Sequence, residues 1–179
     1  MKRGLFFFLF FAALALTGAA AQNVAELSFS FTRQSGSGSN QFAVWIEDTQ
    51  GLYVTTLYAT RFTAKGGWKR RPLSIPQWVK QSGLSDMTES QIDALTGTTP
   101  MTGTLTYRWD GKNSRGVALP PGNYVIFLEG TLRGENKVLY RAPIQTGQGP
   151  ATAEVSVEYF GTSGSERSMI GNVTARVLK

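Results

Sequence analysis

The chain has 179 residues and a formal net charge of +6, and it contains neither histidine nor cysteine. The lack of these two residue types excludes Ser-His-Asp and Cys-His catalysis, His/Cys zinc sites, the usual haem ligands and disulfide bonds. We therefore expect no self-contained enzyme, no metal, no haem, and a fold that is stabilised by packing alone.

Residues 1–21 have the three parts of a secretory signal peptide. A basic head, Met1–Arg3, precedes an apolar run from Leu5 to Leu16, and small residues follow up to Ala21. The apolar run is shorter than the roughly 20 residues that span a bilayer. We predict cleavage between Ala21 and Gln22 and export to a bacterial periplasm, with no membrane-spanning segment. Residues 22–179 are then long enough for one domain with its own core.

Alternating apolar and polar residues predict about eight β-strands in residues 22–179. The alternating runs are AELSFSF, QFAVWIED, LYVTTLYA, GTLTYRW, NYVIFLEG, KVLYRAPI, AEVSVEY and NVTARVL. The short link TQG between the second and third runs suits a hairpin. Many short strands with little helix predict an all-β fold, an Ig-like or fibronectin-like antiparallel β-sandwich. The residues that we expect inside are Phe29, Val44, Ile46, Trp109, Tyr124, Ile126, Val155 and Val157.

Residues 60–102 do not alternate, and we expect them to form an insert with short helices. Pro76 can open a helical turn as its first residue, and Gly83 can close it. The sequence from Thr88 to Gln91 is a capping box, which predicts a helix that starts at this point. An insert of this length in a compact domain tends to be functional.

The insert also contains the basic excess of the chain. No acidic residue occurs between Asp48 and Asp86. The basic residues in this interval are Arg61, Lys65, Lys69, Arg70, Arg71 and Lys80. The charges alone favour a solvated basic loop, and they are also compatible with binding of anionic lipid headgroups or of a partner protein.

The stretch DALTGTT, from Asp93 to Thr99, follows the second expected helix and has two interpretations. The simpler one is a helix that ends on Gly97 in a left-handed conformation and continues into a polar loop. The other is a site where an enzyme modifies a threonine, because the stretch resembles the acceptor motif D-x-x-(Ser/Thr)-G-A-T of bacterial flavin transferases. These enzymes attach FMN to the hydroxyl through a phosphoester.

The resemblance implies that Thr96 is the acceptor and that Asp93, Gly97 and Thr99 are the residues recognised around it. Thr98 stands where the motif usually has alanine. We expect the Thr96 hydroxyl to be exposed for the transferase, and we expect the insert to lie beside it. The residues of the insert that we expect to bind the flavin phosphate or ring are Lys69, Arg70, Arg71, Trp68 and Trp78.

The stretch from Trp109 to Tyr124 has turn residues at regular positions, including Gly111, Gly116 and Gly122. It resembles the W-D-G-x-x-x-x-G-x-x-x-P-x-G-x-Y hairpin in Ig-like domains of the flagellar hook-capping type. The resemblance supports the predicted sandwich and implies little about function, since this fold has many functions.

The signal peptide, the sequence AVWIEDTQGLYVTTLY and the basic insert together resemble a bacterial family of predicted periplasmic proteins, the domain of unknown function 2271. Members of this family tend to be encoded near flavin transferases and PepSY-type membrane proteins. The resemblance therefore implies a flavin transferase and a PepSY-type membrane redox protein as partners. We expect no nucleic-acid partner.

Two functions follow as hypotheses. In the first, the exported protein carries covalent FMN on Thr96 and takes part in extracytosolic electron transfer, because a chain without haem or metal ligands needs an organic cofactor for redox work. In the alternative, it is a non-enzymatic Ig-like binding or structural module whose basic, tryptophan-containing loop contacts a partner.

Overall fold

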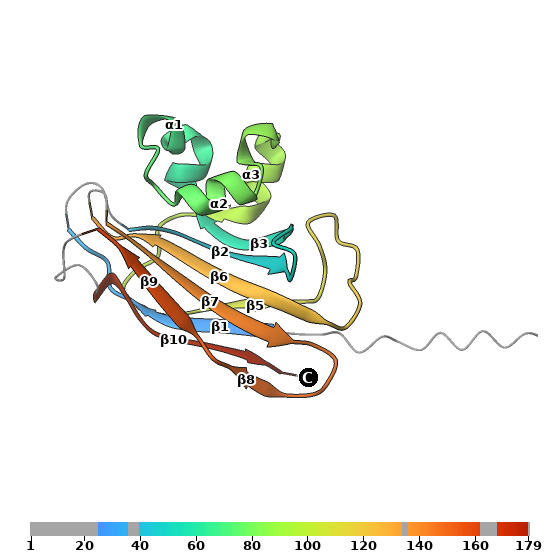
Figure 1. Cartoon of the computed structure of the whole chain (residues 1–179). Coiled ribbons are helices and arrows are strands. Elements are labelled where there is room, and N and C mark those ends of the chain that lie inside the picture. Colours follow the sequence, from blue (N-terminus) through green and yellow to red (C-terminus); the bar gives the residue numbers. More distant parts are fainter. Residues whose placement is uncertain (1–24, 36–39, 134–135, 162–167, 179) are drawn as a thin grey trace, which may run out of the picture.

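A computed structural model describes residues 25–35, 40–133, 136–161 and 168–178. Two β-sheets stack face to face, and short helices cover the outer face of one sheet (Figure 1). This arrangement confirms the predicted all-β sandwich with a helical insert. The predicted signal peptide and its cleavage site lie outside the described residues. Within the part of the chain that the structure describes, no helix has the length and apolar character needed to cross a membrane.

The smaller sheet has four antiparallel strands in the order β5-β1-β10-β8. The strands are β5 (Gly103–Trp109), β1 (Ala25–Phe31), β10 (Ile170–Val177) and β8 (Ala151–Ala153). In β1, apolar side chains such as Leu27 face the core, and Glu26 and Ser28 face outward. The predicted alternation therefore describes this sheet well.

The larger sheet has six strands in the order β4-β3-β2-β6-β7-β9. The strands are β4 (Thr96–Gly97), β3 (Tyr53–Thr60), β2 (Gln41–Asp48), β6 (Asn123–Thr131), β7 (Lys137–Gln145) and β9 (Ser156–Phe160). Strands β2 and β3 form the predicted hairpin. All neighbours are antiparallel except β3 and β4, which run parallel.

The main core lies between the two sheets and contains six of the eight residues expected there. These buried residues are Phe29, Val44, Ile46, Trp109, Tyr124 and Ile126. Val157 is 48% exposed, and Val155 is half-buried. The expectation for Val157 is wrong because AEVSVEY is not one strand. Its two ends join different sheets as β8 and β9, and Val157 lies on the edge strand β9, where cover from neighbouring strands is incomplete.

The insert forms five short helical segments on the outer face of the larger sheet (Figure 1). They are η1 (Thr63–Gly67), α1 (Trp68–Arg70), α2 (Pro76–Gln81), η2 (Leu84–Asp86) and α3 (Glu89–Leu95). The predicted start of α2 at Pro76 and the capping box of α3 are both present. The insert buries a second hydrophobic core that includes Trp45, Trp78 and Phe127. As a result, β2 is buried on both faces, which alternation along a half-exposed strand did not predict.

Helix α2 is attached to β6 by hydrogen bonds that involve backbone amides. The carboxylate of Glu129 accepts hydrogen bonds from the backbone amides of Gln77, at 3.2 Å, and Trp78, at 2.9 Å. The amide of Ile75 donates to the Thr131 hydroxyl at 2.9 Å. Glu129 is 4% exposed, and burial raises its pKa to about 7, although the two amides act in the opposite direction.

The segment between Trp109 and Tyr124 packs as a corner of the sandwich. The two rings meet edge to face with their centroids 4.7 Å apart, and the Trp109 indole donates to the Lys112 carbonyl at 2.7 Å. The strands on either side, β5 and β6, belong to different sheets. The segment is therefore a connection between sheets and not a hairpin of paired strands, with only an isolated bridge between Lys112 and Ala118 inside it.

Candidate functional site

The DALTGTT segment begins in α3, forms the edge strand β4 of the larger sheet, and continues as two residues without regular structure. Thr88 and Gln91 form the reciprocal hydrogen bonds that fix the start of α3. The helix stops at Thr96, whose backbone is extended (φ −119°, ψ 150°). Thr96 then pairs with Ala59 of β3 in parallel register.

Gly97 is part of this short strand and does not form a left-handed helix cap. Gly97 pairs with Thr60 of β3, and its φ is not positive. The interpretation of Gly97 as the conformational stop of the helix is therefore wrong. The lack of a side chain at this position instead lets the ring of Tyr58 approach the backbone.

The hydroxyl of Thr96 is buried, contrary to the expectation that it is exposed. Parallel register places its side chain on the same face of the sheet as Ala59, which belongs to the second core beneath the insert. Among the described residues, Thr96 Oγ1 has no hydrogen-bond partner. A buried hydroxyl without a partner costs about 1–3 kcal/mol, so its presence calls for an explanation.

The insert contacts the DALTGTT segment through Lys65 of η1. Lys65 Nζ lies 2.6 Å from the carboxylate of Asp93 and 3.7 Å from that of Glu89. The side chains of Lys65 and Asp93 are 36% and 48% exposed, so solvent weakens this ion pair. The structure thus brings together one basic residue of the insert and one residue of the motif. Thr99, at the end of the motif, is half-buried.

A hollow of about 300 Å³ lies between η1, η2 and the start of α3. Trp68, Met87 and Ile92 give it apolar walls. Lys65 and Lys69 line it together with one acid, Glu89, so the charged side chains around it are positive in sum. Lys69 Nζ lies 5.4 Å from the centre of the Trp68 ring. This hollow has the chemistry to accept a flat aromatic group that carries a negative charge.

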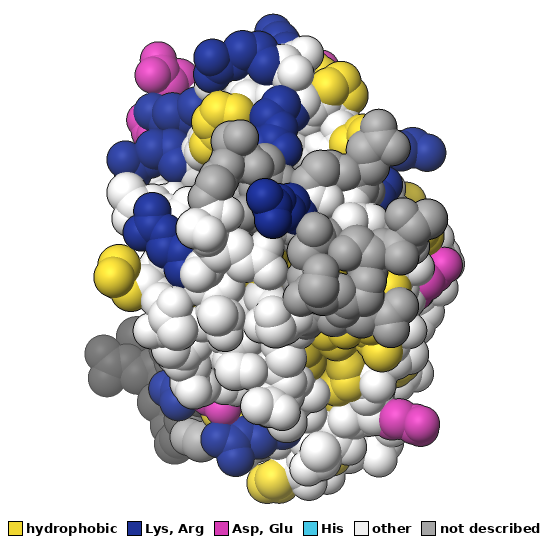
Figure 2. Space-filling view, turned by 90° about the vertical axis from the view of Figure 1, so that its left-hand side faces the viewer, with side chains coloured by type: hydrophobic (Ala, Val, Ile, Leu, Met, Phe, Trp, Pro, Cys, Tyr) yellow, Lys and Arg dark blue, Asp and Glu magenta, His cyan; other side chains and the backbone are white. Residues whose placement is uncertain are grey.

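The other residues predicted for the site are placed differently. Trp78 has no exposed surface, and its indole donates to the Thr56 hydroxyl at 2.9 Å, so this ring supports the second core. Arg70 is exposed and lies 5.5 Å from the centre of the Phe62 ring, and Arg71 is half-buried. Figure 2 shows Lys and Arg side chains gathered over the upper part of the molecule, which is the part occupied by the helices in Figure 1.

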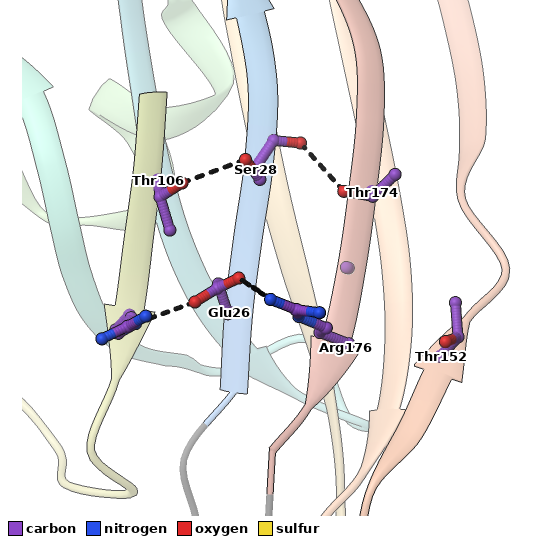
Figure 3. Close-up of a pocket in the computed structure, with 8 residues that line it drawn as sticks. Glu26, Ser28, Thr106, Thr152, Thr174 and Arg176 are labelled. Atoms are coloured by element: carbon purple, nitrogen blue, oxygen red, sulfur yellow. Dashed lines mark hydrogen bonds and ion pairs between the residues drawn. The ribbon is translucent and has the colours of Figure 1, made fainter. Parts of the chain in front are cut away.

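A second polar site, absent from the sequence predictions, lies on the outer face of the smaller sheet. Glu26, Arg108 and Arg176 meet there from three neighbouring strands, beside a hollow of about 750 Å³ (Figure 3). These residues are far apart in the sequence, and only the strand order brings them together. The signal available in the sequence was limited to the polar positions of Glu26, Arg108 and Arg176 in their alternating runs.

Within the described ranges, no group of three or more acidic, histidine or cysteine side chains is arranged to hold a metal ion. A family profile described as "Predicted periplasmic protein (DUF2271)" matches residues 23–162. The search of curated proteins and the search of solved structures gave no significant match.

Proposed function

Since the chain belongs to the DUF2271 family of predicted periplasmic proteins, we propose that it is an exported carrier of covalent FMN on Thr96 that takes part in electron transfer outside the cytosol. The observation that carries this proposal is the unpartnered hydroxyl of Thr96. Valine has nearly the same shape and would avoid the cost of burying that hydroxyl. The presence of threonine at this position is explained if its oxygen is used as a nucleophile.

Attachment of FMN requires of this chain only an accessible hydroxyl group. The Thr96 oxygen forms a bond to the FMN phosphorus of FAD, the P–O bond from that phosphorus to the bridging oxygen breaks, and AMP leaves with the bridging oxygen. The hydroxyl proton passes to a base of the flavin transferase, which also supplies the metal. The attached flavin supplies one- and two-electron chemistry that the side chains of this protein lack.

The buried hydroxyl of Thr96 requires, in this proposal, that part of the insert opens before the transferase can act. The contact between η1 and α3 includes the Lys65–Asp93 ion pair, which is partly exposed and therefore weak. By contrast, α2 is held through the buried carboxylate of Glu129. We therefore place the opening between η1 and α3, as a local event that leaves the sandwich folded.

The hollow beside η1 offers the residues that would hold the attached group. Lys65 and Lys69 supply cations for the phosphate, and Trp68 supplies an accessible aromatic face. Arg70 and Arg71 extend the positive charge along the same segment. Trp78 acts indirectly in this proposal, because it fixes α2 and has no surface with which to contact a ligand.

One observation favours the alternative function, a binding module. Phe62 and Leu73 are 41% and 42% exposed on the insert, close in sequence to Arg61, Arg70 and Arg71. Exposed apolar side chains among basic ones suit contact with an acidic partner or an anionic membrane surface. Such binding weakens with salt, whereas a phosphoester to threonine survives denaturation.

The test is co-expression of the full chain with a flavin transferase from the same organism, followed by denaturing electrophoresis and detection of flavin fluorescence. We expect a fluorescent band for the wild type and for Thr96→Ser, and none for Thr96→Ala. Thr98→Ala is the matched control, since Thr98 is exposed and its replacement restores the usual acceptor motif. It should be labelled at least as well as the wild type. Flavin retained by Thr96→Ala would refute Thr96 as the acceptor. No labelling of the wild type would favour the binding module.

A further inference from the structure

Three charged side chains form a compact cluster on the outer face of the smaller sheet (Figure 3). Arg108 Nε lies 2.8 Å from one carboxylate oxygen of Glu26. Arg176 Nε and Nη2 lie 3.2 Å and 2.9 Å from the other oxygen. The Glu26 side chain is 6% exposed, whereas those of Arg108 and Arg176 are 67% and 59% exposed.

The position of the cluster is fixed by strand register. Glu26 on the inner strand β1 is directly opposite Arg108 on β5 and Arg176 on β10. The hydrogen bond from Arg108 lowers the pKa of Glu26, and the bond and charge of Arg176 act in the same direction against burial. Glu26 is therefore ionised at neutral pH, and the cluster has one positive charge in excess.

Each guanidinium group has five N–H donors, and Glu26 uses only some of them. A cross-strand ion pair needs one arginine for each carboxylate. Here two arginines share one buried carboxylate, which holds their side chains in place. Both side chains are more than half exposed, so donors that Glu26 does not use can reach a further negative charge.

The hollow beside the cluster is polar and large enough for a small ligand. Its volume is about 750 Å³, within the range of small-molecule sites. Four hydroxyl-bearing residues line it together with the charged cluster: Ser28, Thr106, Thr152 and Thr174. Ser28 Oγ and Thr174 Oγ1 donate to the backbone carbonyls of Leu105 and Ser28, and each keeps lone pairs with which to accept. The hydroxyls therefore suit a ligand that carries hydroxyl donors of its own.

We propose that this hollow binds an acidic sugar, with its carboxylate or phosphate between Arg108 and Arg176 and its hydroxyls along the serine and threonine side chains. The site lies on the sheet opposite to the one that carries the insert, so the proposal is independent of FMN attachment at Thr96 (Figure 1).

The test is an NMR titration of the mature protein with three probes: glucuronate, glucose 6-phosphate and glucose. We expect the two acids to shift the amide signals of β1, β5 and β10 around Glu26, Arg108 and Arg176, and glucose to do so much more weakly. Whichever acid binds more tightly identifies the oxyanion as carboxylate or phosphate. The proposal is overturned if all three probes leave these signals unchanged, or if the acids shift only signals of the basic insert.

Variants distinguish binding from a purely structural role of the cluster. Glu26→Gln removes the internal competitor for the guanidinium donors, so we expect tighter binding of the better acid. The double variant Glu26→Gln/Arg108→Gln leaves no unpaired buried carboxylate and should bind about tenfold more weakly than Glu26→Gln alone. Arg141→Gln is the matched control and should leave binding of the acid unchanged, because Arg141 forms a cross-strand pair with Glu158 on the other sheet. Equal affinity of wild type, Glu26→Gln and the double variant would refute the site.

Discussion

The ring of Tyr58 lies against the backbone of Gly97, and its hydroxyl donates to the carbonyl of Thr98 at 2.6 Å. A Cβ atom at position 97 would stand 2.6 Å from Tyr58 Cε2 and 3.0 Å from the hydroxyl oxygen. The ring therefore fastens β4 to the edge of β3 at the residue that follows the proposed acceptor.

Gly97→Ala should destabilise the protein by about 1–3 kcal/mol, since the new methyl group forces the Tyr58 ring out of its position. Chemical denaturation measures this change. In a Tyr58→Leu background the same substitution should cost clearly less, because the ring is gone, and the difference gives the coupling between the two positions. Thr98→Ala is the surface control and should change stability by less than about 0.5 kcal/mol. An unchanged cost in the Tyr58→Leu background would mean that the ring is not the obstacle.

Lys65→Ala and Asp93→Ala should have opposite effects on flavin attachment, although both break the same ion pair. Asp93→Ala removes a residue of the proposed acceptor motif and should slow labelling. Lys65→Ala loosens the contact between η1 and α3, and since an exposed pair is worth about 0.2–1 kcal/mol, initial labelling should rise by up to about fivefold. Time courses of in-gel fluorescence with limiting transferase measure both rates. If the two variants slow labelling equally, the pair acts only as a structural unit.

Glu129 should make the protein less stable as the pH rises from about 5 to 8. Its pKa is raised to about 7 by burial, from an ordinary value of 4.5. In this interval the folded protein keeps the proton that the unfolded chain has released, so deprotonation favours unfolding. The loss is on the order of 3 kcal/mol at most, and it is complete once the pH exceeds the folded pKa. Thermal denaturation across this pH range measures it.

Glu129→Gln is the control for this pH dependence, because the amide cannot ionise and still accepts a hydrogen bond from α2. Its stability should change much less between pH 5 and 8. Glu26 does not interfere in this interval, since its pKa is lowered and its contribution to stability is lost only as the pH falls further. A wild-type protein whose stability is flat or increases from pH 5 to 8 would contradict the role given to Glu129.

Trp109→Ala should destabilise the protein by about 3–5 kcal/mol, as truncation of large core aromatics does. The side chain is 2% exposed, and the substitution removes both its contact with Tyr124 and its hydrogen bond to Lys112. Trp109→Phe keeps an aromatic ring and should cost less. Urea denaturation of both variants tests the ranking, and equal costs would show that ring packing contributes little.

The strands could be predicted from sequence wherever one face of a strand meets the core and the other meets solvent, as in β1. The prediction was incomplete for β2, because its outer face is covered by the insert, and alternation within the strand carries no signal for that cover. It was wrong for Val157 because AEVSVEY leaves one sheet after Ala153 and enters the other at Ser156. That choice depends on the strand partners β10 and β7, which are tertiary information.

The candidate site shows the same limit. The capping box and Pro76 act through neighbouring residues, so the sequence predicted the starts of α3 and α2 correctly. The exposure of Thr96 depends on which face of the sheet its side chain occupies once β4 pairs with β3. The conformation of Gly97 depends on Tyr58, which lies 39 positions earlier in the chain. Both were therefore predicted wrongly from the local helix-ending pattern.

The two residues of β4 also shield the backbone of β3 at the margin of the larger sheet. An uncovered strand edge is a template for pairing with another molecule, and natural proteins commonly protect such edges. If the proposed opening at Thr96 also detaches β4, it would leave the last residues of β3 free to pair with a second copy. Flavin attachment and self-association would then compete for the same transient state, so a crowded periplasm with little transferase would favour aggregation.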